Sequence, residues 1–318
     1  MPIEVGTPIV VADVGKTSIR AEYRSPGEAP VGVETPVGAV VGEAADTRCV
    51  LADLSRVLDR LPAPTREVDA ACVGVAGYLA HPDLHAQLER ELRVQLPVAR
   101  LELTSDLVLA HAGALDGAPG TVLIVGTGAV ALGIAADGEA RMADGLGPLL
   151  GDEGSGGWIG REGLAAGLRA AQGRGPDTAL REAAAGHFEI SVEEIPGHLL
   201  RREHPVRDVA GFAPAVIREW QGGCATATTI VETAAARLAE TIEAATAAPG
   251  RSAPIALLGS LVLDRRFRDL VVGKIGARLP DAPVVEPAGS ALDGAAFLAA
   301  APAGREWFAA LRFRTRSR

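Results

Sequence analysis

The sequence predicts an α/β protein of two lobes, each built on a βββαβα pattern of strands and helices. A strand–turn–strand unit at 9–24 recurs at 121–135, and strands alternating with helices follow each copy. The chain has 318 residues, or two domains at roughly 150 residues each. Hydrophobic residues make up 48% of it and charged residues 22%, which suits a folded core and argues against disorder. We expect the two lobes to face each other across a cleft.

Each expected element follows from its local pattern. Short apolar runs between turn residues predict strands, and apolar side chains at helical spacing, such as Leu51, Leu54 and Leu58, predict helices. In the first half we expect strands at 8–12, 18–24, 32–36, 70–75 and 100–103, and helices at 43–61, 83–96 and 107–115. In the second half we expect strands at 121–125, 129–135, 253–258 and 283–286, and helices at 158–172, 178–186, 191–201, 208–221, 224–247, 264–277 and 290–300. Gly and Pro cluster at 114–120, which predicts the boundary between lobes 1–116 and 117–318, the second with a helical insertion.

Charge and composition argue against several classes of protein. The net charge of −9 predicts no nucleic-acid binding, which gains affinity by releasing counterions from phosphates. No apolar run approaches 18 residues and no signal-peptide pattern is visible, so we expect a cytoplasmic protein with no membrane partner. Cys49, Cys72 and Cys224 are far apart and odd in number, which predicts reduced thiols rather than a zinc site or disulfides. The basic tail at 312–318 is interpreted as a solvated terminus.

The turn after the first strand carries a candidate phosphate and metal site. Gly15, Lys16 and Thr17 could bring backbone N–H groups close to an anion. Asp13, at the strand end, could hold Mg²⁺ through water, because this ion takes hard oxygen ligands and keeps several waters. The spacing is not that of a Walker A loop, and a strand rather than a helix follows. An ordinary hairpin turn is the alternative interpretation.

Gly126, Thr127 and Gly128 form a similar turn at the equivalent place in the second half. Such turns are common in hairpins, so the weight of this motif comes from its position in the repeat. Gly259 and Ser260 follow a later buried strand, where a glycine would let a flat ring pack against the backbone. A plain turn at the strand end is the alternative for these two residues.

Asp106 lies after a strand and before an apolar helix. Capping of the helix by Ser105 or Asp106 explains the residue fully. Alternatively, Asp106 is a general base at the carboxyl end of the strand, because phosphoryl transfer to a sugar hydroxyl needs a carboxylate within hydrogen-bonding reach. The local sequence does not decide between these interpretations.

The glycine-rich loop at 145–157 contains two adjacent acidic residues, Asp152 and Glu153, preceded by Gly151. Acidic residues also favour helix starts, and a helix follows. However, so many glycines carry a cost in backbone entropy, which suggests close approach to a ligand. We expect these carboxylates to accept hydrogen bonds from vicinal sugar hydroxyls.

In this order, the motifs resemble those of the sugar kinase–actin–Hsp70 ATPase superfamily. The segment GPLLGDEGSGGWIG is similar to the N-acetylglucosamine kinase and BadF/BadG-type ATPase family, and the resemblance covers residues 9–300. It implies a ribonuclease H-like, actin-like fold that binds ATP and Mg²⁺, with Asp13 near the metal, Asp106 as catalytic base and Asp152 as sugar ligand. It also implies a first phosphate turn with Gly15 and Thr17, a second with Gly126, Thr127 and Gly128, and an adenosine turn with Gly259 and Ser260. The small residues of the connecting helices would be Gly74, Gly77, Gly289 and Gly294. Three residues depart from the family pattern: Lys16, Val130 and Leu146.

These observations predict an ATP-dependent kinase that phosphorylates a small-molecule sugar, N-acetylglucosamine or glucosamine, at the 6-hydroxyl. One alternative is an ATPase that activates a radical dehydratase or reductase, which would need an iron–sulfur cluster held by paired cysteines. The other is a non-catalytic sugar-binding regulator. A homodimer is expected because it is the commonest closed assembly.

Overall fold

The computed structural model describes residues 6–15, 18–36, 47–61, 68–78, 85–96, 98–246 and 249–300. Contacts divide the chain into two compact units. Unit 1 consists of the described residues within Met1–Gly120, Ile134–Ala140 and Glu286–Arg318. Unit 2 consists of the described residues within Thr121–Gly133 and Arg141–Val285. Lys16, Thr17 and the basic tail lie outside the described residues.

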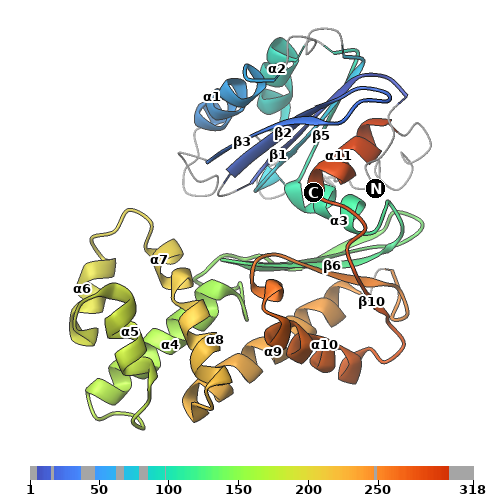
Figure 1. The fold of residues 1–318 in the computed structure, drawn as a ribbon. Coiled ribbons are helices and arrows are strands. Elements are labelled where there is room, and N and C mark those ends of the chain that lie inside the picture. Colours follow the sequence, from blue (N-terminus) through green and yellow to red (C-terminus); the bar gives the residue numbers. More distant parts are fainter. Residues whose placement is uncertain are drawn as a thin grey trace, which may run out of the picture. The chain divides into compact units, whose positions relative to one another are not determined.

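Unit 1 contains a five-stranded sheet with the order β3-β2-β1-β4-β5 (Figure 1). Its strands are β1 (Ile9–Val14), β2 (Ser18–Arg24), β3 (Val31–Pro36), β4 (Ala70–Val75) and β5 (Arg100–Thr104), and its helices are α1 (Thr47–Leu58), α2 (His85–Gln95), α3 (Asp106–Ala114) and α11 (Ala291–Ala300). The first three strands pair antiparallel, whereas β1, β4 and β5 run parallel. Strand β1 continues two residues beyond its predicted end, so Asp13 lies in the strand and not in the turn.

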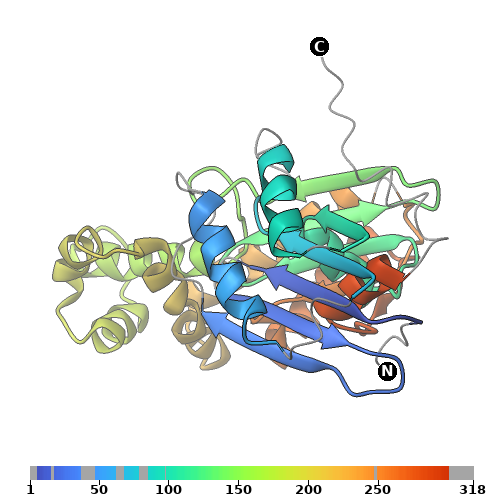
Figure 2. The ribbon, with the colours of Figure 1, turned by 90° about the horizontal axis from the view of Figure 1, so that it is seen from above.

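The two faces of this sheet have different neighbours, because side chains alternate along a strand. Val10, Ala12 and Val14 pack with the buried leucines of α1 and α2 in one apolar core. Figures 1 and 2 show α1 and α2 lying across the strands on this face. Helices α3 and α11 contact β1 and β4. Asp13 therefore lies on the face of the sheet opposite α1 and α2.

Unit 2 repeats the arrangement, with strand order β10-β9-β6-β7-β8. The strands are β6 (Gly120–Val125), β7 (Ala129–Ile134), β8 (Ala140–Asp144), β9 (Ile255–Leu258) and β10 (Val284–Val285). In both sheets, three strands in chain order are extended by two parallel strands next to the first of them. The predicted α/β class with a duplicated core is thus confirmed. Strand β8 was not predicted, because it is a largely exposed edge strand without an apolar run.

The helices of unit 2 form its large apolar core together with β6, β7 and β9. They are α4 (Gly156–Ala171), α5 (Leu180–Phe188), α6 (Ile195–Leu199), α7 (Pro205–Gly211), α8 (Ala213–Gln221), α9 (Ala225–Ala245) and α10 (Arg265–Arg278), with short 3-10 turns η4 (Val192–Glu194) and η5 (Leu261–Leu263). The predicted helix at 208–221 is divided at the fully buried Phe212 into α7 and α8. No helix in the described part of the chain has the length and apolarity needed to span a bilayer.

Helix α11 packs on α3 through small residues. The sequence assigned the whole of 117–318 to the second lobe, whereas contacts group α11 with unit 1. Gly113 of α3 faces Ser290 and Gly294, and Gly294 in turn faces the backbone of Leu109. Since backbone meets backbone there, the two helices approach more closely than side chains would allow.

Replacing Gly294 by alanine is therefore expected to destabilise the protein. The added Cβ would lie 2.5 Å from the amide nitrogen of Gly113, and that nitrogen belongs to the backbone of a buried helix. Overpacking of this kind costs about 1–3 kcal/mol, which calorimetry would detect as a lower melting temperature. The matched control is Gly276→Ala in α10, where a Cβ meets nothing within 4 Å. We expect that variant to gain up to about 1 kcal/mol from helix propensity, and equal stability of the two variants would contradict the packing argument.

Candidate functional site

In unit 1, the predicted carboxylates come together at the carboxyl ends of the parallel strands. Asp13 of β1 pairs in register with Gly74 of β4, which pairs with Thr104 of β5. Asp106 follows two residues later, at the start of α3. A Cβ at Gly74 would lie 3.3 Å from the Cα of Asp106, so this glycine leaves the space that the start of α3 occupies. The carboxyl ends of strands are where open α/β sheets bind their ligands.

Asp13 forms an ion pair with Arg20, which the sequence reasoning missed. Its side chain is almost fully buried, and Arg20 Nη2 donates a 2.5 Å hydrogen bond to its Oδ2. Asp13 and Arg20 lie directly opposite each other in the antiparallel pair of β1 and β2, a register that the local sequence pattern did not reveal. Burial raises the pKa of Asp13 above its usual value, Arg20 lowers that pKa, and the nearby Asp106 carboxylate raises it. Asp13 and Asp106 are therefore close enough to repel each other when both are ionised.

The structure places Asp106 at the start of α3, which agrees with the capping interpretation. Ser105 is the N-cap of α3, and its Oγ accepts a hydrogen bond from the Leu107 amide. Asp106 Oδ1 accepts hydrogen bonds from the same amide at 2.8 Å and from Ser105 Oγ at 2.9 Å. These contacts fix the orientation of a half-buried carboxylate at the end of a parallel strand. The helix start therefore positions Asp106, and its capping role leaves the proposed role of base open to it.

The turn Gly126–Thr127–Gly128 in unit 2 is held by the first residues of α4. The carbonyl oxygens of Gly126 and Thr127 accept hydrogen bonds from the amides of Gly156 and Gly157, at 2.7 and 2.9 Å. A Cβ at Gly156 would lie 2.9 Å from the Gly126 oxygen, so glycine permits this contact. Thr127 is exposed at the tip of the turn.

Asp152 is directed toward the same turn. Its side chain is mostly buried, and Oδ1 lies 3.4 Å from the amide nitrogen of Ala129. A Cβ at Gly128 would lie only 2.7 Å from Asp152 Oδ2. Glu153, in contrast, is exposed, and its Oε1 lies 3.8 Å from Arg237 Nε. The two adjacent acidic residues of the loop thus have different environments, which their spacing alone did not indicate.

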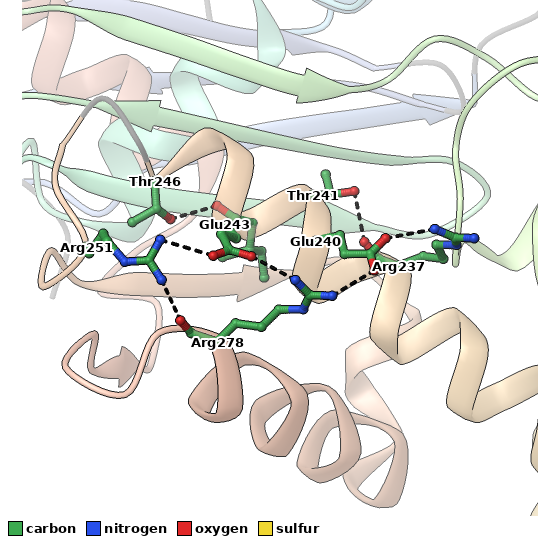
Figure 3. A network of polar contacts seen from close by, with 8 residues as sticks. Arg237, Glu240, Thr241, Glu243, Thr246, Arg251 and Arg278 are labelled. Atoms are coloured by element: carbon green, nitrogen blue, oxygen red, sulfur yellow. Dashed lines mark hydrogen bonds and ion pairs between the residues drawn. The ribbon is translucent and has the colours of Figure 1, made fainter.

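Arg237 belongs to a network of ion pairs between α9 and α10 (Figure 3). Glu240 binds both Arg237 and Arg278, at 2.9 and 2.7 Å. Glu243 binds Arg278 at 2.8 Å and Arg251 at 3.0 Å. Exposed pairs contribute at most about 1 kcal/mol each. Arg237, the cation near Glu153, is therefore also paired with Glu240.

Gly259 and Ser260 lie next to the Gly126 turn. Gly259 has a φ of 102°, and a Cβ there would collide with the backbone of Val125. A Cβ at Gly126 would lie 3.5 Å from Ser260 Oγ. Unit 2 therefore brings together three motifs that the sequence identified separately, namely the turn at 126–128, the loop at 151–153 and the turn at 259–260.

The residues around Asp13 suit a divalent cation. Two carboxylates supply hard oxygen atoms, and the buried one already has the cationic Arg20 as a neighbour. Among the residues that the structure describes, no three His, Cys, Asp or Glu side chains form a complete metal cluster. Mg²⁺ usually binds one or two carboxylates of the protein together with water and the phosphate groups of a substrate.

Comparisons with known proteins support a single family. The model of the BadF/BadG/BcrA/BcrD ATPase family matches residues 12–299. An N-acetylmuramic acid/N-acetylglucosamine kinase from Clostridium acetobutylicum is 26% identical over 188 residues, which are 59% of this chain and 61% of that protein. An N-acetyl-D-glucosamine kinase from Dictyostelium discoideum is 40% identical over 75 residues, which are 24% of each chain. The match thus spans about three fifths of the first relative and a quarter of the second.

A solved structure extends this likeness over nearly the whole chain. A protein assigned as an N-acetylglucosamine kinase from Chromobacterium violaceum is 25% identical, with a TM-score of 0.72. The similarity covers 92% of this chain and 98% of that one. The fold described above, with its two similar sheets, is therefore shared with that protein.

Proposed function

Because the chain belongs to the BadF/BadG/BcrA/BcrD ATPase family, we propose that it is an ATP-dependent kinase that phosphorylates an amino sugar at the 6-hydroxyl. N-acetylglucosamine and glucosamine are the proposed substrates. The observation that carries the proposal is the pair of carboxylates in unit 1, Asp13 and Asp106, which lie close together at the ends of parallel strands. The names of the relatives and of the solved structure support a sugar as the phosphoryl acceptor.

In the proposed reaction, Asp106 accepts the proton of the sugar hydroxyl as this oxygen attacks the terminal phosphorus of ATP, and the bond from that phosphorus to ADP breaks, with ADP as the leaving group. The hydrogen bonds from Leu107 and Ser105 to Oδ1 hold the carboxylate in one orientation for this step. Asp152 and Glu153, with Gly151, would bind sugar hydroxyls through their oxygen atoms. A positioned base contributes about 10²–10⁴-fold to such a reaction.

The remaining predicted residues would bind the nucleotide. Gly126, Thr127 and Gly128, together with Gly15, Lys16 and Thr17, would donate hydrogen bonds to phosphate oxygens, and Gly259 and Ser260 would contact the adenosine. Asp13 would hold Mg²⁺, which when bound neutralises charge on the transferring phosphoryl group. We also propose a cytoplasmic homodimer, on the general frequency of such assemblies.

A panel of sugars tests the proposal. We expect ADP release, followed with a coupled assay, to require N-acetylglucosamine or glucosamine, and the 6-deoxy analogue to give none. Thermal shift with each sugar measures binding independently of turnover. Release of ADP at the same rate with every sugar and without any would contradict a sugar kinase.

Two alternatives make different predictions in the same experiments. A non-catalytic regulator would show a sugar-dependent thermal shift without ADP release. An activator of a radical enzyme would contain iron after anaerobic purification and absorb visible light. Of the three cysteines, Cys72 is fully buried within β4 and Cys224 is a half-buried residue at the start of α9, whereas the side chain of Cys49 lies outside the described residues. We therefore favour the kinase.

A further inference from the structure

The carboxylate of Asp144, just before the glycine-rich loop, holds the backbone at two residues inside that loop. Asp144 is the last residue of β8, and its Oδ1 accepts a 2.7 Å hydrogen bond from the amide of Asp152. Its Oδ2 accepts a 2.9 Å hydrogen bond from the amide of Glu153. One side chain thus holds the backbone of both residues that we propose as sugar ligands. Hydrogen bonds to an ionised carboxylate are shorter and stronger than those between neutral groups.

We call the Asp144 carboxylate, with the two amides that it binds, the clamp. The backbone of the clamp is unusual at two residues. Asp144 and Asp152 both have left-handed backbone conformations, with φ of 59° and 56°. Such conformations are uncommon outside glycine and persist where the surroundings determine them. Asp144 stabilises this conformation of Asp152, because its carboxylate accepts hydrogen bonds from the amides of Asp152 and Glu153.

Gly151 provides the space for the clamp. A Cβ at this position would lie 2.5 Å from Asp144 Oδ1 and 2.7 Å from the Cβ of Leu146. Because Gly151 has no Cβ, the Asp144 carboxylate can reach the amides of Asp152 and Glu153. This explains the glycine without any contact between Gly151 and a ligand. The loop is also tied at Gly145, whose amide donates to the Ala129 carbonyl at 3.0 Å, so β7 supports the same end.

We propose that Asp144 is a positioning residue of the sugar site, which sets the place of Asp152 and Glu153 without touching the substrate. This inference rests on the proposed function, since it assumes that these two residues bind the sugar. It follows that loss of the clamp weakens sugar binding selectively. The turn at 126–128 also accepts hydrogen bonds from the first residues of α4, which do not involve Asp144, so we expect nucleotide binding and folding to change less than sugar binding.

The variant Asp144→Asn separates the clamp from the backbone conformation. Asparagine adopts the left-handed conformation readily, but it has one acceptor oxygen and presents an NH₂ group to the second amide. We expect the KM for the sugar to rise about 10-fold to 100-fold, as small displacements of positioning groups do. We expect the KM for ATP to rise much less than the KM for the sugar, and the melting temperature to change little.

Asp137→Asn is the matched control. Asp137 Oδ1 accepts a 3.0 Å hydrogen bond from the Glu139 amide in the turn that leads into β8, so the same substitution weakens the same kind of contact outside the loop. We expect its sugar KM to be unchanged. An unchanged sugar KM in Asp144→Asn would overturn the inference, and so would an equal rise in the KM for sugar and for ATP, which indicates a general structural role.

Amide hydrogen exchange tests the clamp without any assay of activity. We expect the amides of Asp152 and Glu153 to exchange faster in Asp144→Asn than in the unmodified protein, and at the same rate in Asp137→Asn. Unaltered exchange in Asp144→Asn would show that the clamp does not order the loop. If the unmodified protein shows neither sugar binding nor sugar-dependent ADP release, the proposed function fails, and the exchange experiment still decides whether Asp144 holds the loop.

Discussion

Replacing Asp106 by asparagine is expected to lower turnover at least about 100-fold, because the reaction loses its general base. The fold should survive, since the asparagine Oδ1 can still accept the hydrogen bonds that Leu107 and Ser105 now donate. The melting temperature and the affinity for the sugar are therefore expected to change little. The coupled ADP-release assay measures kcat, and thermal shift with and without sugar measures stability and binding.

Asp264→Asn controls for the capping role of an aspartate at a helix start. Asp264 is the N-cap of α10, and its Oδ1 accepts a 2.9 Å hydrogen bond from the Phe267 amide. This variant changes a helix-start carboxylate in the same way at a residue with no proposed part in the reaction. We expect it to retain full turnover. Full turnover of Asp106→Asn would instead mean that Asp106 serves only the start of α3.

Replacing Asp13 by asparagine is the second change with a large expected effect. Loss of the buried carboxylate should lower turnover about 100-fold to 1,000-fold, in the range found when one electrostatic contact to a transition state is removed. Stability should be little affected, because the raised pKa of Asp13 means that its ionised form is less favourable in the folded than in the unfolded protein. Mg²⁺ titrations, read as kcat and as Mg²⁺-dependent nucleotide binding, are the measurement.

Arg20→Met distinguishes the carboxylate from its ion pair. It removes the same 2.5 Å contact but leaves Asp13 in place, and the half-exposed Arg20 makes no buried cavity when it is shortened. We expect the Mg²⁺ requirement to persist in Arg20→Met and turnover to fall much less than in Asp13→Asn. Equal losses in the two variants would show that Asp13 matters only as the partner of Arg20.

Local pattern was sufficient for most elements of this fold. Strands β2 and β4 occupy the residues predicted from their apolar runs. The repeat of a strand–turn–strand unit in the sequence predicted the duplicated core. The position of Asp106 between a strand and a helix was also predicted, because a strand end followed by a helix start is visible in a few adjacent residues. Such features depend on side-chain periodicity and on turn residues, which act over short distances along the chain.

The relations between distant residues needed the folded chain. The sequence predicted Asp152 as a sugar ligand. Its orientation toward Gly128, and the hydrogen bonds that the amides of Asp152 and Glu153 donate to Asp144, depend on how β7, β8 and the loop come together. The pairing of Asp13 with Arg20 depends on the register of a hairpin, and the grouping of α11 with unit 1 depends on two glycine faces that are 181 positions apart at Gly113 and Gly294. Composition and spacing specify which elements form, whereas packing between elements specifies which side chains meet.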